Sequence, residues 1–83
     1  MLLRWQKQSR YFTVSVYQDL VGDWILTQTW GDSQSDESEF MHCVLPSLQD
    51  AETQLHKIRL GLIRQGYQED AKQISPESIY EQI

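Results

Sequence analysis

The segment RYFTVSVYQDLVGDWILTQTW, residues 10–30, decides the fold of this chain. Its first part alternates in character, and one side of it carries Phe12, Val14 and Val16. A period of two in β-branched and aromatic residues predicts a strand with one buried face. Gly22 then follows between two aspartates and indicates a turn. We therefore expect the chain to return as a second strand over residues 24–30.

Two further strands are expected on either side of this pair. The polar stretch DSQSDES reads as a loop, and EFMHCVL, residues 39–45, follows it as a strand that ends before Pro46. Residues 2–7 can supply a fourth strand. A parallel pair needs a crossover of a dozen or more residues, and these connections are short. The sequence therefore predicts an antiparallel sheet of three to four strands.

One main helix is predicted over about residues 47–65. Ser47 precedes Asp50 by three residues, which resembles a capping box, and Gly66 offers a left-handed cap at the other end. Apolar residues recur between them at steps of three and four, which makes one stripe: Leu48, Ala51, Leu55, Ile58 and Leu62. A sheet packed on this stripe gives an α+β domain, for which Leu55 supplies a central core residue.

The domain is expected to span residues 1–67, and residues 68–83 form a tail. Ser75 and Pro76 can start a short helix, and its apolar edge would carry Ile79, Tyr80 and Ile83. Leu60 and Ile63 fall off the stripe of the main helix and need cover of their own. The tail of the same chain or a second copy would provide it, so the protein is expected to be a monomer or a weak homo-oligomer.

Composition indicates an ordinary globular domain. Of the 83 residues, 40% are hydrophobic and 23% are charged, which is too apolar for a disordered chain. No window approaches the roughly 18 apolar residues needed to cross a bilayer. The first ten residues lack the apolar core of a signal peptide, and one cysteine excludes an internal disulfide. These features favour a cytoplasmic protein with no membrane partner.

The formal charge of −5 is unevenly distributed. Residues 32–54 contain six carboxylates and no lysine or arginine, whereas residues 55–66 contain three bases and no acid. An acidic chain is repelled by a phosphate backbone unless its bases gather on one face. The acidic segment would instead attract a basic protein.

Several short motifs, taken in order, resemble the WGR domain. They are RYF at 10–12, DLVGDW at 19–24, Trp30-Gly31, and Gly66-Tyr67 after the helix. The resemblance covers about residues 10–67 and implies a small module in which an antiparallel sheet carries one helix. In poly-ADP-ribose polymerases such a module binds damaged DNA ends through the Trp and Arg of its signature. Asp32 stands here in place of that arginine, so an anion replaces a donor suited to phosphate.

Two functions stay open on these residues. The first is a DNA-associated module with weak, salt-sensitive binding; the second is an acidic module that kept the fold and binds a basic protein. The contact residues expected for either ligand are Trp30, Gly31, Asp32, Lys57 and Arg64. Trp30 ends a strand beside a loop, where binding aromatics often occur, and both bases lie on the helix face opposite the stripe.

Catalytic and metal sites are not predicted. The loop carboxylates lie among serines and are expected to be solvated, and their spacing fails the calcium pattern because Glu37 and Cys43 occupy its glycine and glutamate positions. His42 and Cys43 are neighbours on a strand and point to opposite faces, which excludes a shared metal. Cys43 is in phase with Leu45 and is expected to be a buried thiol. We therefore expect a protein that is not an enzyme and has no cofactor.

Overall fold

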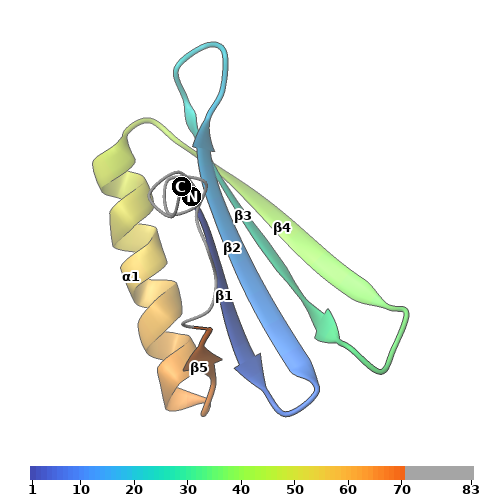
Figure 1. Ribbon diagram of the computed structural model, residues 1–83. Helices are drawn as coiled ribbons and strands as arrows, with labels where there is room; N and C mark the ends of the chain where they lie inside the picture. The colour runs from blue at the N-terminus through green and yellow to red at the C-terminus, as the bar shows by residue number, and fades with distance from the viewer. Residues whose placement is uncertain (71–83) are drawn as a thin grey trace, which may run out of the picture.

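The computed structural model describes residues 1–70. Figure 1 shows a sheet with one helix against it. The elements, in chain order, are β1 (Leu2–Lys7), β2 (Arg10–Gln18), β3 (Trp24–Asp32), β4 (Ser38–Leu45), α1 (Leu48–Arg64) and β5 (Gln68–Glu69). The helix expected after Ser75, and its docking on Leu60 and Ile63, lie outside the described residues.

The predicted α+β fold is confirmed. The sheet has the order β4-β3-β2-β1-β5, and every neighbouring pair is antiparallel. The fourth strand that the sequence suggested is present as β1. The fifth strand, β5, is an addition: it pairs Glu69 with Trp5, just past residue 67, where the domain was expected to end.

The turns follow from local chemistry. Between β2 and β3, Gly22 adopts φ +96°, a left-handed conformation that side chains rarely tolerate. The Asp19 carboxylate accepts hydrogen bonds from the backbone amides of Val21 and Asp23 in the same turn, at 3.0 and 2.9 Å. At the start of α1 the Ser47 hydroxyl accepts from the Asp50 amide at 3.1 Å, which confirms the predicted cap.

The core lies between α1 and one face of the sheet. Its buried members are Trp5, Val14, Val16, Leu26, Ala51, Leu55 and Leu62. Two expectations need correction. Leu48 was placed on the core stripe but is 42% exposed, and it is the first residue of α1. Cys43 is half-buried rather than buried, since it packs at the margin of the core.

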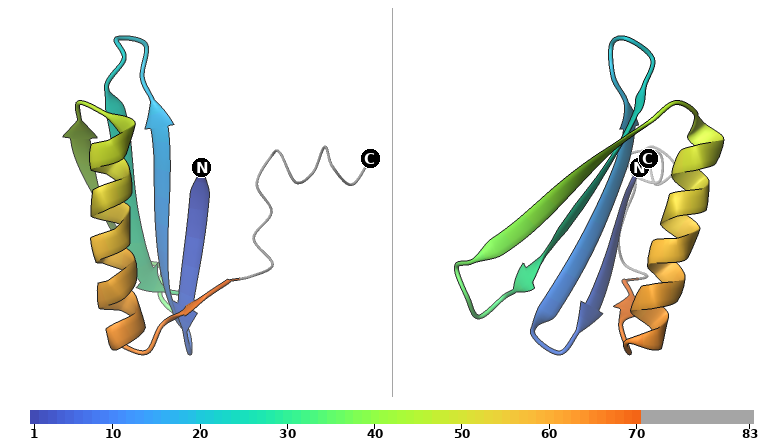
Figure 2. Two further views of the ribbon diagram at one scale, coloured as in Figure 1. Left: turned by 90° about the vertical axis from the view of Figure 1, so that its left-hand side faces the viewer. Right: turned by 180° about the vertical axis from the view of Figure 1, so that it is seen from behind.

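The helix crosses the sheet diagonally. It begins close to the end of β4, and its last turn lies beside β1 and β5, while the start of β4 points away from it (Figures 1 and 2). Met41 is in phase with Cys43 and Leu45 on the helix-facing side, yet it remains 56% exposed. Because α1 and the start of β4 diverge, the end of β3 and the start of β4 lack the cover that α1 gives to the core.

Candidate functional site

Trp30 is the central residue of the candidate site. It lies near the end of β3 and is half-buried, on the side of the sheet that faces α1. Its ring stacks on Phe12 of the neighbouring strand, with 5.7 Å between ring centroids and 10° between their planes. Its indole Nε1 donates to the Glu39 carboxylate at 3.1 Å. One ring face and the only polar atom of Trp30 are thus already engaged.

Gly31 is required by packing. It pairs directly with Tyr11 across the β2–β3 ladder. A Cβ at this position would approach the Tyr11 hydroxyl oxygen to 2.8 Å and the Glu37 carbonyl oxygen to 3.0 Å. The Trp-Gly pair that carried the family resemblance therefore has a structural explanation in this chain: tryptophan packs on one face of the sheet, and glycine admits a tyrosine ring on the other.

Asp32 holds two turns together. Its carboxylate accepts from the Ser9 hydroxyl at 3.0 Å and from the Gln34 amide at 2.9 Å. The first bond reaches the β1–β2 turn, and the second closes the turn that follows β3. The aspartate at the signature position thus organises this end of the sheet.

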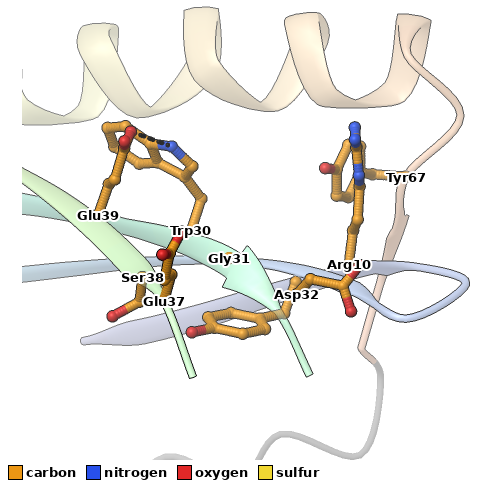
Figure 3. A pocket seen from close by; sticks show the side chains of 9 residues that line it. Arg10, Trp30, Gly31, Asp32, Glu37, Ser38, Glu39 and Tyr67 are labelled. Atoms are coloured by element: carbon orange, nitrogen blue, oxygen red, sulfur yellow. Dashed lines mark hydrogen bonds between the residues drawn. The ribbon is translucent and has the colours of Figure 1, made fainter. Parts of the chain in front are cut away.

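An open hollow of about 380 Å³ surrounds these residues, and we call it the Trp30 hollow. Figure 3 shows Trp30 and Glu39 at one side of it and Arg10 and Tyr67 at the other. Its lining residues are Arg10, Tyr11, Trp30, Gly31, Asp32, Glu37, Ser38, Glu39 and Tyr67. Three carboxylates and one guanidinium line it, so the hollow carries a negative formal charge.

The hollow continues as a shallow groove toward the middle of α1. A second space of about 320 Å³ shares Arg10, Trp30 and Tyr67 with it, and a third of about 250 Å³ reaches Lys57. Of the five predicted contact residues, Trp30, Gly31 and Asp32 line the hollow itself. Lys57 lies farther along the groove, and Arg64 is not among the residues that line any of these three spaces.

Two residues outside the five predicted contact residues, Arg10 and Tyr67, also line the hollow. Tyr67 follows the helix cap, where Gly66 has φ +93° and turns the chain back toward β1. Arg10 pairs with Asp32 across the β2–β3 ladder and thereby lies beside the end of β3. The antiparallel pairing of β2 with β3 is enough to predict from the sequence that Arg10 lies beside the end of β3. The position of Tyr67 depends on where α1 ends relative to the sheet, which the sequence pattern does not give.

Other kinds of site have little support within residues 1–70. No group of three or more His, Cys, Asp or Glu side chains there is placed to hold a metal ion. The His42 Nδ1 atom is 2.8 Å from the Thr27 hydroxyl, on the face of β4 opposite to Cys43. Within the same residues, no helix has both the length and the apolar character to cross a membrane.

No family model, no curated protein and no solved structure matches the chain. The resemblance to the WGR domain therefore remains a prediction that rests on the short motifs of the sequence.

Proposed function

We propose that this protein is a non-catalytic binding module whose Trp30 hollow accepts a cationic side chain of a basic protein partner. The observation that carries the proposal is the charge of the lining: Asp32, Glu37 and Glu39 stand against Arg10 alone. Aromatic rings beside carboxylates favour a lysine or arginine side chain through both cation–π and ionic attraction. The hollow is open, so a side chain can enter without rearrangement of the sheet.

Glu39 is the residue on which this proposal depends most. It holds the Trp30 indole and leaves its second carboxylate oxygen for a ligand. Asp32 already accepts two hydrogen bonds from its own chain, so its contribution to ligand binding would be mainly its negative charge and not a direct hydrogen bond. An incoming guanidinium would meet the Glu39 carboxylate, with the rings of Trp30 and Tyr67 at its sides.

The test is isothermal titration calorimetry of the protein with a short arginine-containing peptide, at low and at moderate salt. We expect weak binding that declines with salt, and a loss of several-fold in affinity for Glu39→Gln. Glu52→Gln is the matched control, because it removes the same charge from an exposed position on α1 away from the hollow. Equal effects of the two substitutions would contradict the proposal.

A DNA-associated module is the second candidate, and one observation favours it. Arg10 and Lys57 lie along the same groove as Trp30, and neither has an ion pair within residues 1–70. The protein should therefore also be titrated with nicked duplex DNA under the same conditions. If DNA binds at low salt, and Arg10→Gln weakens it while the basic peptide does not bind, the second candidate replaces the first.

A further inference from the structure

Strand β4 forms an open edge of the sheet. It lies at the end of the strand order and pairs only with β3 among the described residues, over eight residues from Ser38 to Leu45. An edge strand presents unpaired backbone N–H and C=O groups to whatever lies beside it. Figure 2 shows β4 at the margin of the sheet, away from the last turn of α1.

The side chains of β4 do not protect this edge. Phe40 and Val44 are 66% and 62% exposed on the face away from α1, and Met41 is 56% exposed on the other face. Edges are usually shielded by lysines, prolines or bulges, which discourage pairing with another chain. Residues 40–45 contain no charged residue and no proline.

We propose that two copies of this chain pair through β4, antiparallel about a two-fold axis at His42. In this register Phe40 lies opposite the partner's Val44, and Met41 lies opposite the partner's Cys43. Each exposed apolar side chain of the edge then meets another apolar or thiol side chain on the same face of the joined sheet. A continuous sheet across the two copies results, in which both β4 strands become internal.

The neighbouring registers are less complementary. A two-fold axis perpendicular to the sheet keeps the α1 side of both copies on the same face. Such an axis must pass through a residue of β4, so the register can change only by moving the axis to a neighbouring residue. An axis at Met41 sets Glu39 opposite the partner's Cys43. An axis at Cys43 sets Phe40 opposite the partner's Pro46, which has no N–H to donate. The register at His42 sets Glu39 opposite the partner's Leu45 and Ser38 opposite the partner's Pro46, so the acid and the proline lie at the ends of the paired stretch and not within it.

Electrostatics also permits pairing at this edge. Each copy carries a formal charge of −5, but the paired stretch centred on the axis, residues 40–44, is uncharged. The two Glu39 side chains lie at opposite ends, roughly 20 Å apart at about 3.4 Å per residue, which exceeds the screening length of about 8 Å at physiological salt. Glu37 lies past the end of the partner's β4, whereas Glu39, which also lines the Trp30 hollow, lies opposite the partner's Leu45. The proposed dimer requires no ligand in the Trp30 hollow, because it is formed by the backbone edge and the apolar side chains of β4.

Sedimentation equilibrium over a wide range of protein concentration tests the association. We expect a concentration-dependent dimer, and a dissociation constant at least about tenfold higher for Val44→Lys, which corresponds to a loss of about 1.4 kcal/mol. Tyr17→Lys is the matched control, since it introduces the same charge on the same face of the sheet, on central strand β2, at a residue that is 51% exposed. A monomer at all concentrations, or equal effects of the two lysines, would overturn the proposal.

Cross-linking tests the register. Opposed residues of antiparallel strands have Cα atoms about 4.5–5.5 Å apart, which suits a disulfide. Oxidation of Met41→Cys should therefore give a covalent dimer through the partner's Cys43, while the unsubstituted protein and the double variant Met41→Cys/Cys43→Ser should not. Cross-linking of the double variant would place the axis at Met41 and overturn the register at His42.

Discussion

The two edges of the sheet are built in opposite ways. At the β5 edge, a two-residue strand pairs with β1 and is followed by a hydrogen bond from the Asp70 amide to the Arg4 carbonyl at 2.8 Å. The Glu69 carboxylate lies 3.3 Å from Arg59, and Lys7 Nζ donates to the Gln65 carbonyl at 2.7 Å. At the β4 edge, an eight-residue strand exposes Phe40, Met41 and Val44 and has no comparable cover within residues 1–70.

The difference follows from the path of α1. The last turn of the helix brings residues 65–70 against β1, so the chain closes that edge with its own backbone and charges. The same diagonal path carries the helix away from the start of β4, so the Trp30 hollow lies uncovered near the open β4 edge. The chain thus covers the β1 side of the sheet with its own residues, and the exposed apolar side chains of β4 lie at the opposite edge.

The largest effect is expected at the core that supports both edges. Leu55 is 7% exposed, so Leu55→Asp would place an unpaired charge among apolar side chains. We expect a loss above about 4 kcal/mol, close to the whole stability of a domain of this size. Thermal unfolding by circular dichroism should then lack a cooperative transition, and hydrogen exchange should be fast at both edges.

Leu60→Asp is the control for this substitution. Leu60 is on the same helix but 42% exposed, and we expect a change of about 0.5 kcal/mol or less. A Leu55→Asp protein that melts like Leu60→Asp would show that the wrong face of α1 has been assigned to the core.

The sequence predicted those parts of the fold that depend on local pattern. The alternation in β2 and the stripe around Leu55 have periods that only one secondary structure satisfies, and Ser47 and Gly66 supply caps with a known geometry. Strand β5 was missed because two residues carry no periodicity. It is defined by its pairing with β1, which joins residues far apart in the sequence and is encoded by no local pattern.

The candidate site was only partly predictable for the same reason. Trp30, Gly31 and Asp32 are consecutive, so the loop signal found all three. Tyr67 was missed because its approach to Trp30 is set by the crossing of α1 over the sheet, which no local pattern encodes. The exposure of Met41 has the same origin, since alternation gives the side of a strand but not whether a helix covers it.

An intermediate effect is expected on the β4 side of the sheet from Gly31→Ala. The new Cβ would press on Tyr11 and on the Glu37 carbonyl, and overpacking of this kind costs about 1–3 kcal/mol. We expect faster hydrogen exchange in the β3–β4 hairpin than in β1, together with a lower midpoint of denaturant unfolding.

Two variants sharpen this prediction. Gly61→Ala meets no atom within 4 Å and lies inside α1, so it should stabilise the protein by roughly 0.5–1 kcal/mol. Combining Gly31→Ala with Tyr11→Ala should cost less than the sum of the single changes, because the clash is relieved. Additive losses would mean that the tyrosine ring is not the group that excludes a side chain at position 31.

The smallest effect is expected from the ion pair at the closed edge. The Arg59 and Glu69 side chains are 36% and 45% exposed, and pairs of this kind contribute about 0–1 kcal/mol. Glu69→Gln should therefore lower stability only slightly, and less at high salt. Arg59→Gln should cost more, since the guanidinium also lies over the Trp5 ring at 6.0 Å.

A double-mutant cycle from denaturant unfolding separates the two contributions. A coupling energy above about 1.5 kcal/mol would show that charge, rather than the backbone pairing of β5 with β1, closes this edge.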